Sequence, residues 1–158
     1  MSFQRVRPKI MESVAMRNLV LVLGDQLDAE SAAFDGFDKT QDRVWMAEVA
    51  EENTHVWCHK MRIAFFLSAM RHFRNHLESR NIEVCYHELT VQPQNDCRST
   101  FAEVLELDVQ KYAPQKLIVV EPGDWRVQEA LMTAADALGI ELEIRPDRHF
   151  YCSVEDFK

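Results

Sequence analysis

An uninterrupted apolar run at residues 19–23 is followed at once by the polar turn of Gly24, Asp25 and Gln26. An apolar run without alternation is typical of a strand buried on both faces, and such strands occur at the centre of parallel sheets. The polar turn then lies at the carboxyl end of the strand, which is where open α/β sheets bind their ligands. We therefore expect Gly24, Asp25, Gln26 and Leu27 to form the floor of a small-molecule site.

Strand-like and helix-like segments alternate along the rest of the chain. We expect strands at residues 43–48, 82–87, 116–120 and 141–145, and helices at residues 59–80, 100–112 and 124–138. This alternation is typical of a doubly wound parallel sheet with helices on both faces. The runs most apolar throughout, residues 19–23 and 117–120, should lie side by side at the centre. The predicted fold is therefore an α/β, Rossmann-like sheet of five parallel strands in the order 3-2-1-4-5, with its topological switch between strands one and four.

Capping residues mark the ends of the expected helices. Thr100 and Glu103 have the spacing of a capping box, and Asp124 is a good N-cap residue. Asn81 suits the left-handed position that ends a helix, and Gly139 follows the last helix. Local chemistry thus predicts where the helices begin and end.

The longest expected helix, residues 59–80, carries an apolar stripe at helical spacing. The stripe consists of Ile63, Phe66, Leu67, Met70, Phe73 and Leu77. We expect this stripe to face the core. A shorter helical patch is expected at residues 29–34, before the turn pair Asp35-Gly36.

Length and charge limit the classes of function. The chain of 158 residues is long enough for one α/β domain, which we place at residues 18–146 after a flexible leader at residues 1–17. A net charge of −8 argues against duplex-DNA binding by this chain alone, because phosphate neutralisation needs a basic face. No apolar run approaches the ~20 residues of a membrane span, and the first residues lack the apolar segment of a signal peptide. We therefore expect a cytoplasmic protein without a membrane partner.

Polar side chains also follow the second and fourth expected strands. Glu48, with Glu51 and Glu52, follows the second strand, and residues 121–124 follow the fourth. Neither glycine-rich phosphate-binding motif is present, so a polyphosphate is not the expected ligand. Carboxylates and the Gln26 amide suit hydrogen-bond donors on a heterocycle or on a hydroxylated chain. Solvated loops are the alternative interpretation of these charges.

Histidine and cysteine residues offer another alternative, a zinc site. His55, Cys58 and His59 have i, i+3, i+4 spacing, which on a helix would place three zinc ligands on one face. No fourth ligand is evident, and a helix start with a partly buried histidine and cysteine explains the same residues. The cysteines form no C-x-x-C pair, so we expect reduced thiols at Cys58, Cys85, Cys97 and Cys152. No Ser or Cys lies in a nucleophile elbow, so nucleophilic hydrolysis has no support.

Several short strings occur together in one order. They are LGDQL at residues 23–27, MAEV at 46–49 with Glu52, HK at 59–60, SAMRHF at 68–73 and EPGDWR at 121–126. In this combination, the chain from about Asn18 onward resembles the N-terminal domain of the deoxyribodipyrimidine photolyase-related family. This family comprises the bacterial (6-4) photolyases and the cryptochromes that carry an iron–sulfur cluster. Cys58-His59-Lys60 differs from the His-His-Lys run of many members, and His55 stands where an aromatic residue is common.

The resemblance implies an antenna domain that binds 6,7-dimethyl-8-ribityllumazine and passes light energy to FAD. By position, it assigns the pocket to Gly24, Asp25, Gln26, Leu27, Ala47, Glu48, Glu52, His59 and Phe66. FAD, a 4Fe-4S cluster and the damaged-DNA site would lie in a C-terminal helical domain outside this chain. Residues 147–158 would then begin the linker to that domain, and the cysteines here would not be cluster ligands.

The same resemblance implies light-driven repair of (6-4) photoproducts or blue-light sensing by the whole protein, and no catalysis by this chain alone. The helical FAD domain is the expected partner, and damaged DNA is reached only through the full-length protein. Without that domain, apolar surface near the tail should be exposed and promote self-association. The alternative is a stand-alone nucleotide-binding module of the same fold without photochemistry, because one sheet order accommodates many ligands.

Overall fold

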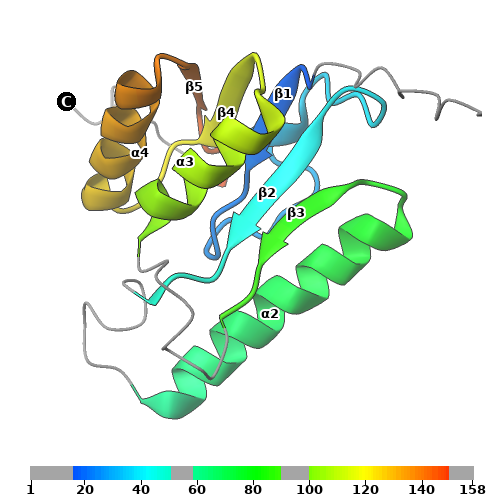
Figure 1. The fold of residues 1–158 in the computed structure, drawn as a ribbon. Helices are drawn as coiled ribbons and strands as arrows, with labels where there is room; N and C mark the ends of the chain where they lie inside the picture. The colour runs from blue at the N-terminus through cyan, green and yellow to red at the C-terminus, as the bar shows by residue number, and fades with distance from the viewer. Residues whose placement is uncertain (1–15, 51–58, 90–99, 150–158) are drawn as a thin grey trace, which may run out of the picture.

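The computed structural model describes residues 16–50, 59–89 and 100–149. Its sheet contains β1 (Asn18–Leu21), β2 (Arg43–Ala47), β3 (Val84–His87), β4 (Lys116–Val120) and β5 (Glu141–Arg145). All neighbouring strands are parallel, and their order is β3-β2-β1-β4-β5 (Figure 1). The predicted α/β fold class and strand order are confirmed, including the central pairing of β1 with β4.

Helices cover both faces of this sheet. On one face lie α2 (Lys60–Ser79) and the 3-10 helix η1 (Ala32–Phe34), and on the other lie α3 (Phe101–Tyr112) and α4 (Trp125–Leu138) (Figure 1). Side chains of β1 alternate between the two layers: Leu19 and Leu21 pack against α3 and α4, whereas Val20 packs on the side of α2. The central strand β1 is apolar on both faces because each face of the sheet is covered by its own apolar layer.

The predicted helix ends are confirmed. The hydroxyl of Thr100 accepts a hydrogen bond from the Glu103 N–H, and the Glu103 carboxylate accepts one from the Thr100 N–H. The Asp124 carboxylate accepts a hydrogen bond from the Arg126 N–H, which caps α4. Asn81 has a φ of 58° after α2, and Gly139 has a φ of 65° after α4.

Three strands are shorter than the sequence predicts; β2 differs only in that Glu48 follows its last residue, Ala47. After Val22, whose N–H still donates to the Trp45 carbonyl, the chain turns, and the Leu23 carbonyl accepts from the Gln26 N–H instead of from a neighbouring strand. At the other strand, the Ile82 N–H donates to the Leu77 carbonyl at the end of α2, so β3 begins only at Val84. At the end of β1 and before the start of β3, a local hydrogen bond thus replaces the hydrogen bond to a neighbouring strand.

The expected helical patch at residues 29–34 is reduced to the single 3-10 turn of η1. The predicted turn after it is present, with Gly36 at a φ of 72°. Within the parts of the chain that the structure describes, no helix combines the length and apolar character needed to cross a membrane.

The predicted leader at residues 1–17 is too long by two residues, because Met16 is buried in the core and Arg17 pairs with Asp42. Residues 1–15, most of the tail after residue 146, and the segments 51–58 and 90–99 lie outside the described residues.

Candidate functional site: a cavity at the switch point

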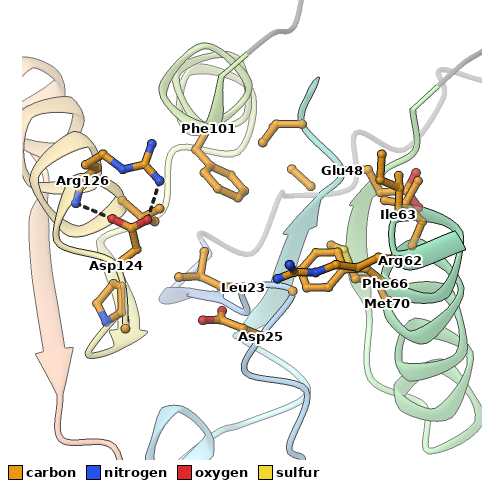
Figure 2. A pocket seen from close by; sticks show the side chains of 17 residues that line it. Leu23, Asp25, Glu48, Arg62, Ile63, Phe66, Met70, Phe101, Asp124 and Arg126 are labelled. Carbon is orange, nitrogen blue, oxygen red and sulfur yellow. Dashed lines mark hydrogen bonds and ion pairs between the residues drawn. The ribbon is translucent and has the colours of Figure 1, made fainter. Parts of the chain in front are cut away.

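A cavity of about 460 Å³ opens at the carboxyl ends of β1, β2 and β4 (Figure 2). The first turns of α2 form one wall, and the beginnings of α3 and α4 form the opposite wall. Its apolar lining includes Leu23, Ala47, Ile63, Phe66, Leu67, Met70, Phe101 and Val127, and its charged lining comprises Asp25, Glu48, Arg62, Asp124 and Arg126. Cavities of this size and composition are typical of small-molecule sites.

Gly24 lets the wall formed by α2 come close to the end of β1. A Cβ atom at this position would lie 2.5 Å from two ring carbons of Phe66 and 3.0 Å from the sulfur of Met70. Real Cβ atoms do not approach other atoms so closely, so any larger residue would push the helix or the Phe66 ring away. The glycine of the strand-end turn is therefore required by the packing of the cavity wall.

Gln26 joins the two loops that flank the topological switch. Its side-chain Nε2 donates to the backbone carbonyls of Val120, at 3.2 Å, and Glu121, at 3.0 Å. The Gln26 side chain thereby holds the turn after β1 against the loop after β4, which are the loops that carry Asp25 and Gly123 into the cavity. The Gln26 amide thus connects the turn after β1 to the loop after β4.

Glu48 is buried and fully engaged in hydrogen bonds. Its carboxylate accepts from Arg71 Nε at 2.7 Å and Nη2 at 2.8 Å, from the Tyr86 hydroxyl at 2.5 Å and from the Leu89 N–H at 2.9 Å. Burial alone would raise the pKa of Glu48, but the hydrogen bonds from Arg71, Tyr86 and Leu89 outweigh burial and lower it. Arg71 also pairs with Glu88. The Glu48 carboxylate therefore connects α2 to the ends of β2 and β3.

Arg62 and Asp25 place opposite charges in the middle of the cavity. Figure 2 shows Arg62 reaching from α2 across Phe66, with Asp25 below it on the floor. On the far wall, Arg126 pairs with Asp124, the N-cap of α4, while Phe101 projects into the cavity from α3. The cavity thus combines two aromatic rings with hydrogen-bond donors and acceptors.

Comparison with known proteins places this architecture in a family. The model of the family described as Deoxyribodipyrimidine photo-lyase-related protein matches residues 20–158. The chain belongs to this family. A similar protein is the (6-4) photolyase of Agrobacterium fabrum (strain C58 / ATCC 33970), which is 39% identical over 143 residues. The match covers 90% of the present chain but only 28% of the relative, so the chain spans little more than a quarter of the relative's length.

In this photolyase-related chain, most of the predicted pocket residues lie together. Gly24, Asp25, Ala47, Glu48 and Phe66 all line the cavity. The carboxylate of Glu48 nevertheless has its hydrogen-bonding partners on α2, on β3 and in the chain just after β3, so its side chain supports the wall of the cavity.

The remaining predicted pocket residues lie elsewhere. Gln26 and Leu27 border a neighbouring hollow that also contains Asp28 and His149. His59 caps α2, because its Nδ1 accepts a hydrogen bond from the Met61 N–H at 3.2 Å. Glu52 lies outside the described residues.

The zinc hypothesis stays untested, because two of its three residues are not described. His55 and Cys58 lie outside the described residues, and His59 uses its ring nitrogen as a helix cap. No group of three or more His, Cys, Asp or Glu side chains in the described part of the family domain is arranged to hold a metal ion. Of the cysteines, Cys85 is described, and it is a buried free thiol.

Arg62 and Phe101 are among the cavity residues that the sequence interpretation of this photolyase-related domain does not assign to the pocket. Arg62 lies one helical turn before Phe66, so the i, i+4 spacing could have placed it on the same wall. Phe101 follows the predicted N-cap Thr100, but nothing in the local sequence indicates that its ring faces the end of β1.

A second buried carboxylate lies behind the cavity. The carboxylate of Asp108 accepts a hydrogen bond from Trp45 Nε1 at 2.8 Å and pairs with His87 Nε2. Burial alone would raise the pKa of Asp108, but His87 and Trp45 together lower it. Trp45 is fully buried and packs against Phe101, so this network supports the aromatic wall that α3 contributes.

Proposed function

We propose that this chain is the light-harvesting domain of a photolyase- or cryptochrome-like protein and that its cavity binds a lumazine, 6,7-dimethyl-8-ribityllumazine. The observation that carries the proposal is the cavity at the switch point, which opens beside Gly24 and Asp25 at the end of β1. Membership of the family supports the photolyase relationship, while the lining of the cavity supports the ligand.

The residues that line the cavity fit such a chromophore chemically. A lumazine is a flat heterocycle with carbonyl oxygens and a ring N–H, and its ribityl chain carries hydroxyls. Phe66 and Phe101 offer apolar ring faces for the heterocycle. Arg62 offers donors for carbonyl oxygens, and Asp25 offers an acceptor for N–H or O–H groups. Asp124 offers a second acceptor beside Arg126.

The role of this chain is to hold and orient the chromophore. When bound, the lumazine supplies absorption of violet-blue light. The apolar walls exclude water from the heterocycle, and the Gln26 amide with the Glu48–Arg71 pair keeps both walls at a fixed separation. We assign no bond-breaking step to Asp25 or to any other residue of the cavity.

The chemical reaction, in this proposal, belongs to the other part of a larger protein. That part would hold FAD and a 4Fe-4S cluster and would act in the cytoplasm, either in repair of (6-4) DNA photoproducts or in blue-light sensing. The named activity of the Agrobacterium fabrum relative supports repair. The match to little more than a quarter of that relative supports a larger protein in which chromophore binding and the chemical reaction lie in different domains.

Titration of the purified chain with 6,7-dimethyl-8-ribityllumazine tests the proposal. We expect a change in lumazine fluorescence that saturates, and a thermal midpoint that rises with lumazine concentration, because a ligand of the native state stabilises it. Reversing the cavity charge with Arg62→Glu should weaken binding at least tenfold. The matched control Arg80→Glu, at the exposed far end of α2, should bind like the wild type.

An unchanged midpoint and unchanged fluorescence at saturating lumazine would refute the proposed ligand. ATP, titrated in parallel, tests the alternative of a nucleotide-binding module. Stabilisation by ATP without stabilisation by lumazine would favour that alternative.

A further inference from the structure

A second hollow, of about 460 Å³, adjoins the cavity at the end of β1. Gly24, Asp25 and Gly123 line both spaces. Because the two glycines carry no side chain, these three positions place only the Asp25 side chain at the boundary, on the floor of the cavity (Figure 2). The two spaces therefore meet between the turn after β1 and the loop after β4.

The hollow differs from the cavity in the charge of its lining. Arginines and aromatic rings line the cavity, but none of the described residues that line the hollow is a Lys, an Arg or an aromatic ring other than histidine. The polar side chains of the hollow are Asp25, Gln26, Asp28, Ser31, Asp147 and His149. The combined site thus has an apolar compartment and an acidic compartment.

The three carboxylates of the hollow outnumber its single imidazole. The His149 ring lies 3.1 Å from an oxygen of Asp147 and 3.8 Å from an oxygen of Asp28. Asp25 supplies the third carboxylate. Because His149 contributes at most one positive charge, the hollow is negative in either protonation state of this histidine.

The segment after β5 forms one wall of the hollow, and the two arginines beside this wall contact other groups. Arg145 donates to the carbonyls of Ala32, at 2.8 Å, and Asp35, at 2.9 Å. Arg148 pairs with the Asp35 carboxylate. Neither guanidinium lines the hollow, so neither offsets its negative charge.

Gln26 adds an acceptor without a donor. Its Nε2 donates to two backbone carbonyls, which fixes the orientation of the amide. Its Oε1 is buried and accepts no hydrogen bond within the described part of the chain. A buried acceptor without a donor costs free energy, so a hydroxyl is the kind of group that this part of the site lacks.

The turn after β1 also lacks the features by which related sheets bind phosphate. In nucleotide-binding sheets, this turn leads into a helix whose N-terminal N–H groups bind the phosphate. Here the turn carries Asp25 and Asp28 and leads only to the three-residue η1. The position that commonly attracts a phosphate is therefore acidic in this chain.

We propose that the hollow binds the ribityl tail of the chromophore and rejects a phosphate on that tail, with Asp28 and Asp147 as the residues that determine this specificity. The proposal rests on the function proposed above. The hydroxyls of a ribityl chain offer donors to the two carboxylates and to Gln26. A phosphate brings acceptor oxygens and about two negative charges at pH 7, which the carboxylates repel. The domain thus selects an unphosphorylated ribityl heterocycle.

Two pairs of ligands that differ only by a phosphate test the proposal. They are 6,7-dimethyl-8-ribityllumazine with its ribityl 5′-phosphate, and riboflavin with FMN. In fluorescence titrations of the purified chain at low salt, we expect the unphosphorylated member of each pair to bind at least tenfold more tightly. Added salt should narrow this preference, because screening weakens the repulsion.

The double variant Asp28→Asn, Asp147→Asn should bring the two affinities of each pair within threefold. Asparagine keeps the Oδ1 acceptors that receive the backbone N–H groups of Glu30 and His149, so the local turns are retained. The matched control Glu129→Gln, Asp136→Asn removes the same charge from the exposed side of α4 and should keep the tenfold preference.

Equal binding of phosphorylated and unphosphorylated ligands by the wild type would overturn the proposal. A preference that persists in Asp28→Asn, Asp147→Asn would also overturn it, because the shape of the hollow rather than its charge would then reject the phosphate. If the double variant has no cooperative unfolding transition, the two single variants replace it, and each should narrow the preference. Single variants with the preference of the wild type would overturn the proposal as well.

The two proposals fail separately. Equal binding of lumazine and its phosphate would retain the chromophore and refute the specificity of the hollow. Binding of riboflavin in preference to FMN, without any binding of lumazine, would refute the chromophore and retain the specificity. Absence of binding by all four ligands would refute both.

Discussion

The first half of α2, residues 60–69, is richer in apolar residues than the second half, residues 70–79, yet the buried side chains lie in the second half. In the second half, Met70 and Leu77 are buried against the sheet, and Arg71 is tied to the buried Glu48. In the first half, Met61 and Phe65 are exposed, and their neighbours Arg62 and Phe66 face the cavity. The second half is thus buried against the sheet, whereas the first half lines the cavity on one side and exposes Met61 and Phe65 on the other.

The apolar stripe of α2 packs against the core along one part of the helix and lines the cavity along another. The stripe from Ile63 to Leu77 was predicted to face the core throughout. In the structure Phe66 and Leu67 pack against the core as predicted and also line the cavity, whereas Ile63 lines the cavity only, because the helix is longer than the strands beside it. A stripe that is continuous in sequence is therefore divided by the edge of the sheet.

Truncation of Leu77 should produce the largest effect. Leu77→Ala removes a fully buried side chain and should lower the free energy of unfolding by about 3 kcal/mol. Phe65→Ala, a larger truncation in the first half of α2, should change it by less than about 0.5 kcal/mol. Urea denaturation of both variants of the isolated chain measures the comparison. Equal losses would mean that the two halves of α2 contribute equally to stability.

Neutralisation of Glu48 should have the next largest effect. Glu48→Gln leaves Arg71 and Tyr86 without their anionic partner and should cost about 2 kcal/mol at pH 7. Because the folded-state pKa of Glu48 is lowered, this stabilisation is fully present above the ordinary carboxyl pKa of about 4.3 and is lost as the pH falls through the lower folded-state value. Urea midpoints between pH 7 and pH 3 should therefore converge for wild type and variant.

The matched control for this experiment is Glu88→Gln. Glu88 pairs with the same arginine, Arg71, but its side chain is 48% exposed, so its loss should cost less than about 1 kcal/mol. A difference between wild type and Glu48→Gln that stays constant down to pH 3 would contradict the role assigned to the Glu48 carboxylate.

Addition of a methyl group at Gly24 should lower the free energy of unfolding by less. The methyl group would meet α2 at Phe66 and Met70, where the two halves of the helix join. Gly24→Ala places a Cβ 2.5 Å from the Phe66 ring and should cost about 1 to 2 kcal/mol while weakening lumazine binding. Gly123→Ala is the control in the same cavity, since its Cβ would meet Asp25 Oδ2 at an ordinary 3.8 Å. Thermal unfolding with and without lumazine measures both quantities. Similar results for the two variants would refute the close approach of α2 to Gly24.

Local chemistry made much of the fold predictable. The capping box of Thr100 and Glu103, the N-cap Asp124 and the left-handed Asn81 each act within a few residues, so the sequence alone places these helix ends. The apolar run at residues 19–23 likewise predicts a central strand with a polar turn at its carboxyl end. Gly24 and Asp25 of that turn line the cavity, because strand order brings the ends of β1, β2 and β4 together.

The roles of individual side chains were decided by the tertiary structure. Glu48 follows a strand in sequence like a ligand-binding carboxylate, but partners 23, 38 and 41 residues away occupy its oxygens. Gln26 meets carbonyls 94 and 95 residues away, and no local pattern specifies them. The sequence by itself determined the order of the elements, because periodicity and capping are local. Which charges face the cavity and which support its walls depends on contacts between distant segments, and only the folded chain brings those segments together.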